Sequence, residues 1–305
     1  MSFLLIILPI FTLVGVGYLL RFIGLIDRQG ISTLNRFVYN VSLPALIIMS
    51  FWNIDWRDTE TLYTLIINTF LLLSFAFLLF LTLKLFPISP KLKAAIFASG
   101  LVGNTIYMGF PIGERALTEE MFSFYVAAAT PHLVMGIVIS VLAIQWYLST
   151  SHGLYDYTKK FLFNPLIISL LCGIGLSLSG ISGVLMGYLQ EVGRLLATPA
   201  SPIALITLGA FMYKSFIPKL AGWAVFGTAV KLAVLPLFLF IGGTLLDVDS
   251  EIMIASVLAG AMPTAVTSFV IAEQYDASPE LVATTLFVST LCAIGSLSLV
   301  LIMLL

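Results

Sequence analysis

Charged residues are scarce in this sequence. Its 305 residues include 14 Lys and Arg and 15 Asp and Glu, so only 10% of the chain is charged, whereas about 25% is usual for a soluble domain. A soluble protein of this length needs more charged and polar side chains than this to cover its surface. The composition excludes an ordinary globular domain and predicts that lipid surrounds most of the chain.

Cysteine and clustered charge are equally scarce. Cys172 and Cys292 lie in apolar stretches without the spacing of a metal site, and we expect both to be buried thiols. A net charge of −1 without any basic run argues against a nucleic-acid partner. The sequence also lacks a Ser/His/Asp order, a phosphate-binding loop and a zinc-binding spacing, which are the common signatures of an enzyme. We therefore expect a protein that is not an enzyme and holds no metal or cofactor.

Long apolar runs are abundant. A helix needs about 20 predominantly apolar residues to cross a hydrocarbon layer of about 30 Å. The chain offers ten such segments, which predicts an all-α integral membrane protein with ten transmembrane helices. The predicted spans are residues 2–22, 32–52, 61–86, 93–117, 121–149, 162–180, 184–213, 219–246, 251–274 and 279–304.

Basic residues collect in alternate loops between these spans. Three of them, Arg57, Arg115 and Arg194, lie on one side, and Lys231 lies within the eighth span. The other side is expected to be cytoplasmic because cytoplasmic loops carry the excess of Lys and Arg. This predicts a cell (inner) membrane protein with both termini outside. The ten residues on the cytoplasmic side are Arg21, Arg28, Arg36, Lys84, Lys91, Lys93, Lys159, Lys160, Lys214 and Lys219.

Helix-breaking residues occur at matching places in the two halves of the chain. Spans two and four carry Ser42-Leu43-Pro44 and the segment from Gly103 to Pro111, and spans seven and nine carry Thr198-Pro199 and Gly260 to Thr264. The second and fourth spans of each half are thus predicted to be interrupted. Because five is odd, a repeat of five spans is inverted in the membrane, as in many transporters.

A break within a membrane helix has chemical consequences. Proline removes a backbone donor and glycine eases unwinding, and the freed groups cost several kcal/mol each in hydrocarbon unless they are satisfied. The half-helix that follows a break presents unpaired N–H groups and about half a positive charge at its N-terminus. Two matched breaks therefore favour one anion site between them, although a single proline can also simply kink a helix.

Six motifs in order resemble the auxin efflux carrier family, which includes plant carriers and bacterial organic-acid permeases. The resemblance covers essentially the whole chain, and the short connection between spans five and six is similar to that of the compact bacterial members. The motifs are Leu34-Asn35-Arg36-Phe37-Val38-Tyr39 with Ser42-Leu43-Pro44-Ala45-Leu46, Gly103-Asn104-Thr105 with Met108-Gly109-Phe110-Pro111, Asn164-Pro165, Leu208-Gly209-Ala210, Met262-Pro263-Thr264-Ala265-Val266 and Ala272-Glu273-Gln274-Tyr275.

The resemblance implies a fold shared with bile-acid symporters, in which broken helices four and nine cross at the substrate site. It implies scaffold helices in residues 1–52 and 162–213, which also form a homodimer, and transport-domain helices in residues 61–149 and 219–304. Candidate helix-break residues are Pro44, Gly103, Gly109 and Pro111.

Site candidates follow from the breaks and from this resemblance. The resemblance implies that Asn104 contacts the substrate through its amide, and His132, in span five, can donate to an anion or titrate during coupling. Lys231 is a second coupling candidate, as a counter-ion within the membrane or as a side chain that reaches the interface. The remaining substrate-binding candidates are Thr105, Tyr107, Asn164, Pro263, Thr264 and Thr267.

These features favour a secondary active or facilitative transporter of small organic anions, mono- or dicarboxylates such as malate or malonate. The resemblance implies an elevator-type alternating-access mechanism, and a proton and sodium are the candidate coupling ions. The alternatives are a sodium-coupled organic-anion symporter and a membrane sensor that binds a small carboxylate without transporting it.

Overall fold

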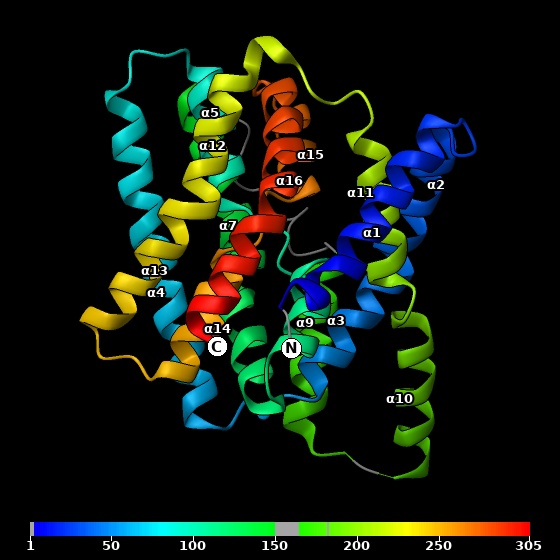
Figure 1. Ribbon diagram of the computed structural model, residues 1–305. Helices are drawn as coiled ribbons and strands as arrows, with labels where there is room; N and C mark the ends of the chain where they lie inside the picture. Colours follow the sequence, from blue (N-terminus) through cyan, green and yellow to red (C-terminus); the bar gives the residue numbers. More distant parts are fainter. Residues whose placement is uncertain (1–2, 150–164, 182) are drawn as a thin grey trace. The chain divides into compact units, whose positions relative to one another are not determined.

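The computed structural model describes residues 3–149, 165–181 and 183–305 (Figure 1). Within these residues, helices lie in all ten predicted spans. Seven helices are long and apolar enough to cross a membrane. The prediction of an all-helical, multi-pass membrane protein is thereby confirmed at this coarser level. Asn164, Lys159 and Lys160 lie outside the described residues.

The chain divides into two compact units, and the first consists of Met1–Phe11, Tyr63–Ser151 and Met212–Leu305. In it, α5 and α14 pack on α7, and α12 packs on α16. Figure 1 shows α5, α12 and α16 side by side. Its helices are the first part of α1 (Phe3–Phe22), α4 (Thr59–Leu85, which begins in the other unit), α5 (Pro90–Leu101), α6 (Gly109–Ala116), α7 (Glu119–Leu148), η2 (Pro218–Leu220), α12 (Ala221–Ala229), η3 (Val230–Val234), α13 (Leu235–Leu245), α14 (Ser250–Gly260), α15 (Val266–Gln274) and α16 (Pro279–Leu304).

The second unit consists of Thr12–Leu62 and His152–Phe211. In it, α3 packs on both α9 and α10. Its helices are the later part of α1 (Phe3–Phe22), α2 (Arg28–Phe37), η1 (Val38–Ser42), α3 (Leu43–Trp52), α9 (Pro165–Ser179), α10 (Val184–Ala197) and α11 (Ala200–Met212, which ends one residue beyond the unit).

Glycine sets the distance between α1 and α11. A Cβ atom added to Gly209 would lie 1.8 Å from the carbonyl oxygen of Val14, and one added to Gly17 would lie 1.9 Å from that of Ile206. These contacts are possible only without a side chain, and small residues are the usual means of close helix approach in membranes. The Leu208-Gly209-Ala210 segment therefore has a packing role.

Span two is continuous where the sequence predicts a break at Pro44. The chain instead forms a π-helical turn, η1, directly before Leu43 and Pro44, and the amide of Leu43 donates to the carbonyl of Val38. A proline ring clashes with the carbonyl four residues earlier in an α-helix, and the wider π turn accommodates this without unwinding. The same device recurs at η3 before Pro236, where the sequence predicts no irregularity.

Span seven is also less interrupted than its sequence predicts. Only Thr198 and Pro199 separate α10 from α11, and the amide of Thr198 still donates to the carbonyl of Arg194 at 2.9 Å. The prediction of an interrupted second span is therefore wrong for span two, and in span seven the interruption is limited to these two residues. Span four is unwound only between α5 and α6, at residues 102–108, and span nine only between α14 and α15, at residues 261–265. Pro199 occupies a helix-compatible position near the start of α11, where its missing donor is not needed.

Both cysteines are exposed, contrary to the expectation of buried thiols. In a membrane helix the outward face is apolar as well, so an apolar sequence context does not indicate burial. Among the described residues neither cysteine forms a disulfide, and no group of His, Cys, Asp and Glu could hold a metal ion.

Candidate functional site

The two unwound segments, residues 102–108 and 261–265, are joined by backbone hydrogen bonds. Gly103 and Thr264 form an isolated antiparallel β-bridge. The amide of Asn104 donates to the carbonyl of Pro263 at 2.8 Å, and the amide of Ala265 donates to the carbonyl of Val102 at 3.1 Å. Each break thus satisfies backbone groups that the other break exposes, which is how unwound chain is tolerated at membrane depth.

Local sequence explains why both segments leave the helix here. Val102 and Ala265 have extended backbones, which is the conformation that an antiparallel bridge needs. Pro263 has no amide hydrogen to donate to an α-helix, but its carbonyl is free to accept from Asn104. The chain then re-enters helix at Gly109 in α6 and at Val266 in α15.

The carbonyls at the end of α5 accept hydrogen bonds from the opposite break. The Thr264 hydroxyl donates to the carbonyl of Ser99 at 2.9 Å, and the Ser268 hydroxyl donates to that of Ala98 at 3.3 Å. The hydroxyl of Ser289, on α16, accepts from the amide of Thr264 at 3.2 Å. A helix end has unpaired carbonyls that need such partners, so these hydroxyls stabilise the break.

Tyr125 holds the first break from the side of α7. Its phenol donates to the carbonyl of Thr105 at 2.9 Å, and the whole residue is buried. A Cβ atom added to Gly109 would lie 1.8 Å from the Tyr125 hydroxyl oxygen. Glycine at position 109 is therefore required for the tyrosine to reach the unwound segment.

Lys231 and His132 are fully buried within the first unit. The Lys231 ammonium donates to the carbonyl of Gly260, the last residue of α14, at 2.6 Å. Both ring nitrogens of His132 lack a hydrogen-bond partner among the described residues, and His132 lies close enough to Lys231 for an electrostatic interaction. Lys231 does not reach an interface, which removes one of the two roles considered for it.

The structure brings several predicted residues together and leaves others apart. Gly103 and Asn104 meet Thr264 and Pro263 at the crossing, and Thr105 follows them in the first unwound segment. Tyr107 and Thr267 are half-buried beside the breaks. Pro111 lies in the first turn of α6, and Pro44 belongs to the other unit. Nothing is described for Asn164.

Three further residues contribute to this site without having been predicted. They are Tyr125, Ser268 and Ser289. Thr285 and Ser289 stand four residues apart on α16, so the polar face that they share on one apolar helix was a readable signal. For Tyr125 no sequence signal existed, because its partner is a backbone carbonyl.

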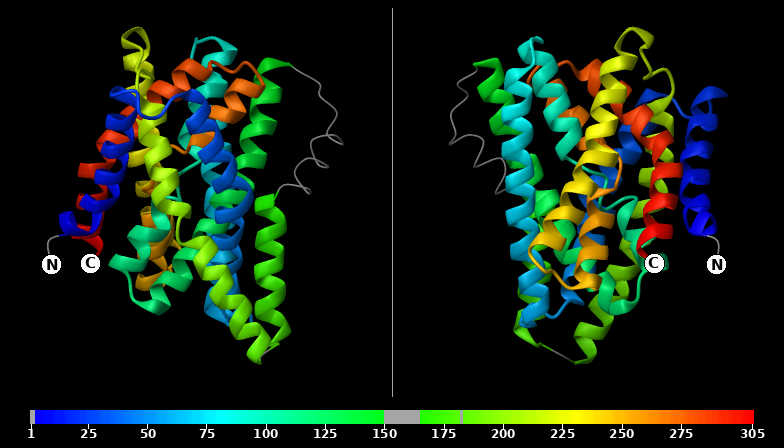
Figure 2. Two further views of the ribbon diagram at one scale, coloured as in Figure 1. Left: turned by 90° about the vertical axis from the view of Figure 1, so that its right-hand side faces the viewer. Right: turned by 60° about the vertical axis from the view of Figure 1, so that its left-hand side comes forward.

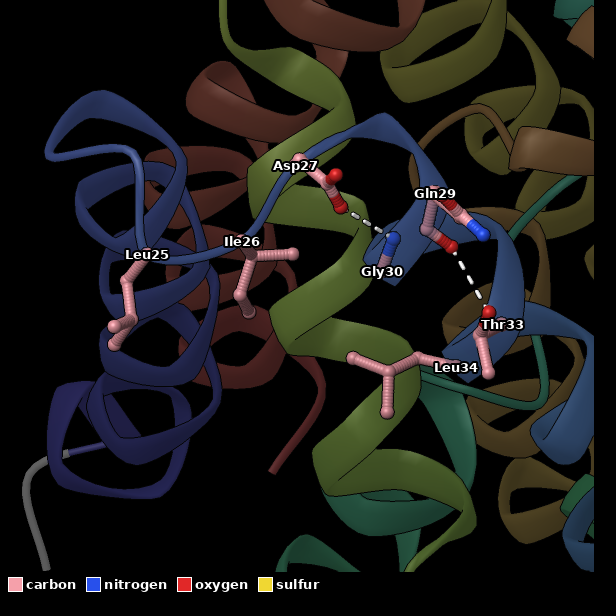
Figure 3. Close-up of a pocket in the computed structure, with 7 residues that line it drawn as sticks. All are labelled: Leu25, Ile26, Asp27, Gln29, Gly30, Thr33 and Leu34. Carbon is pink, nitrogen blue, oxygen red and sulfur yellow. Dashed lines mark hydrogen bonds between the residues drawn. The ribbon is translucent and has the colours of Figure 1, made fainter.

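A separate cavity of about 430 Å³ lies at the start of α2 (Figure 3). Its lining comes from the single stretch 25–34, and the Asp27 carboxylate accepts from the amide of Gly30 at 2.7 Å. Figure 3 shows this carboxylate already occupying the helix N-terminus. An anion would meet a negative charge there, so this cavity is a poor carboxylate site.

Nearly the whole chain matches a known protein family. A sequence model for the family described as "Membrane transport protein" matches residues 3–152 and, a second time, residues 150–301. The double match shows that the chain contains an internal repeat, with one broken span in each copy. Gly103 and Thr264, which form the backbone bridge, therefore belong to different copies of the repeat.

Three similar proteins align with nearly the full length of this chain. An "Uncharacterized transporter" of Methanothermobacter thermautotrophicus is 23% identical over 303 residues, which is 96% of this chain and 95% of that protein. A protein of Rhizobium meliloti described as "Putative malonate transporter" is 23% identical over 303 residues, 96% of this chain and 92% of its own length. An "Uncharacterized transporter" of Methanocaldococcus jannaschii is 21% identical, with 93% of each chain covered.

Proposed function

Because the chain belongs to the membrane transport protein family, that is, the auxin efflux carrier family, we propose that it is a secondary carrier of small organic anions. Its substrates are mono- or dicarboxylates such as malate or malonate, and it works by alternating access. The observation that carries the proposal is the backbone bridge between the two unwound segments, from Gly103 to Thr264. The name of the Rhizobium relative supports the substrate class.

The proposed anion site lies where the two half-helices begin again. After the bridged residues the chain returns to helix at Gly109 in α6 and at Val266 in α15, and helix N-termini favour negative charge. The carboxylate is held by Asn104 and His132, whose polar atoms can donate to it. The further proposed contacts are Thr105, Tyr107, Asn164, Pro263, Thr264 and Thr267.

The proposed topology has ten spans and both termini outside. The start of α1 and the end of α16 lie at the same end of the first unit in both views of Figure 2, which supports an even number of spans. The distribution of basic residues supports the orientation. Lys214 and Asp247 flank the span formed by η2 to α13, so cysteines at these two positions are expected to be labelled from opposite sides.

The proposed motion is an elevator movement of the helices in residues 61–149 and 219–304, which make up most of the first unit, against the scaffold helices in residues 1–52 and 162–213. Both unwound segments and the hydrogen-bond partners described above belong to one compact unit, which supports their travelling together. In this proposal the scaffold helices also form the homodimer contact. The mass of the purified protein in detergent tests the dimer.

Uptake by proteoliposomes tests the function. We expect labelled malonate or malate to accumulate and other small carboxylates to compete with it. Neutral amides of the same size are expected to have no effect, because the site selects its ligands by their negative charge. A panel in which no carboxylate enters faster than into empty liposomes would contradict the proposal. With a proton gradient in place, His132→Gln shows whether the histidine is the coupling group by removing the pH dependence of uptake.

A further inference from the structure

Lys231 lies at the backbone crossing itself. It belongs to the π-helical turn η3, its side chain has no exposed surface, and its ammonium donates to the Gly260 carbonyl at 2.6 Å. A Cβ atom added to Gly103 would lie 2.9 Å from both Cε and Nζ of Lys231. The ammonium therefore lies between the end of α14 and the first unwound residues that follow α5.

This position is electrostatically suited to a cation. The C-terminus of a helix carries about half a negative charge on its unpaired carbonyls, and α14 ends at Gly260. In the described ranges, 3–149, 165–181 and 183–305, no carboxylate forms an ion pair with Lys231. A buried cation needs a compensating partner, and here the end of the half-helix is that partner.

The two half-helix ends are capped in different ways. The carbonyls at the end of α5 accept from uncharged groups, namely the hydroxyls of Thr264 and Ser268 and the amide of Ala265. The carbonyl at the end of α14 accepts from a charged amine. The crossing thus contains one fixed positive charge, supplied by the chain.

We propose that Lys231 is the resident cation of the crossing. Carriers with unwound helices use half-helix C-terminal ends and freed carbonyls to coordinate Na⁺ or H⁺. The Lys231 ammonium occupies that kind of place, so the carrier moves its carboxylate without sodium. This inference rests on the proposed function and names the group that takes the place of a sodium ion.

His132 strengthens the assignment to the site. Its two ring nitrogens are buried and lack partners among the described residues, and the ring is within range of an electrostatic interaction with Lys231. A polar group left unpaired in hydrocarbon is costly, and an anion placed near the crossing would accept from this ring while it is attracted by the ammonium. Lys231 therefore also makes the site selective for a negatively charged substrate.

The test compares uptake in sodium-containing and choline-containing media. Wild-type uptake is expected to be equal in the two media within twofold. Lys231→Ala is expected to lower uptake in choline about tenfold or more, as for the loss of one hydrogen bond from a charged donor, and Na⁺ or a small alkylammonium ion is expected to restore part of it. The matched control is Lys219→Ala, which removes an exposed lysine from the start of the same span.

The outcomes separate the two claims. Wild-type uptake that requires Na⁺, or a folded Lys231→Ala protein that no cation restores, would overturn the resident cation and keep the carrier. No carboxylate uptake by wild type in either medium would instead reject the proposed function. If Lys231→Ala does not fold, Gly103→Ala tests the same point by pushing the ammonium away from the crossing, and unchanged uptake by that variant would also overturn the inference.

Discussion

Gly109→Ala is expected to lower carboxylate uptake about tenfold or more and to destabilise the protein by roughly 1 to 3 kcal/mol. The added methyl group would lie 1.8 Å from the Tyr125 hydroxyl oxygen, which holds the Thr105 carbonyl. The tyrosine must then move, and the first unwound segment loses its support from α7. Uptake and thermal unfolding of the purified protein in detergent measure the two effects.

A double-mutant cycle tests the reason for this effect. Tyr125→Phe removes the hydroxyl and leaves Cζ 2.9 Å from the added carbon, so Gly109→Ala is expected to cost less in that background, with a coupling of about 0.5 to 3 kcal/mol. Gly136→Ala is the control because its nearest neighbour would be 3.9 Å away. Additive effects of Gly109→Ala and Tyr125→Phe would show that the phenol is not the cause.

Asn104→Ala is expected to weaken carboxylate binding about 10- to 150-fold, the effect of losing a hydrogen bond to a charged group worth roughly 1.5 to 3 kcal/mol. The backbone hydrogen bond from position 104 to Pro263 does not need the side chain, so the crossing is expected to survive the substitution. Calorimetric titration with malonate measures the affinity.

Asn68→Ala is the matched control for this substitution. Asn68 is another buried amide in the first unit and donates to the Ser256 hydroxyl at 2.8 Å. Its loss is expected to lower the unfolding temperature without changing affinity. Equal losses of affinity in both variants would mean that Asn104 acts on stability alone and that the carboxylate binds elsewhere.

The sequence predicted the helical segments well because an apolar run of span length is a local signal. The unwound segments of spans four and nine were equally readable, since Gly103, Pro111 and Pro263 act on their own backbone. The π-helical turns that precede Pro44 and Pro236 were not readable. A Leu-Pro pair is compatible with a kink, a break or a widened turn, and packing decides among them.

The hydrogen bonds of the site were the least predictable part. Lys231, Tyr125 and Thr264 all donate to backbone carbonyls, and a carbonyl leaves no trace in the sequence because every residue has one. The resemblance indicated that helices four and nine cross. The charge at the crossing became apparent only when Lys231 was found beside Gly103 and Gly260.

The central claim is that the unwound segments reach each side of the membrane in turn, and cysteine accessibility at Thr105 tests it most directly. The variant Thr105→Cys is made in a protein whose Cys172 and Cys292 are replaced by alanine, and Lys214→Cys and Asp247→Cys serve as markers of the two sides. The account predicts that a small thiol reagent reaches position 105 from either side, that carboxylate changes both rates, and that each marker is labelled from one side only. Labelling of position 105 from a single side under every condition would contradict alternating access and favour a protein that binds its ligand without transporting it.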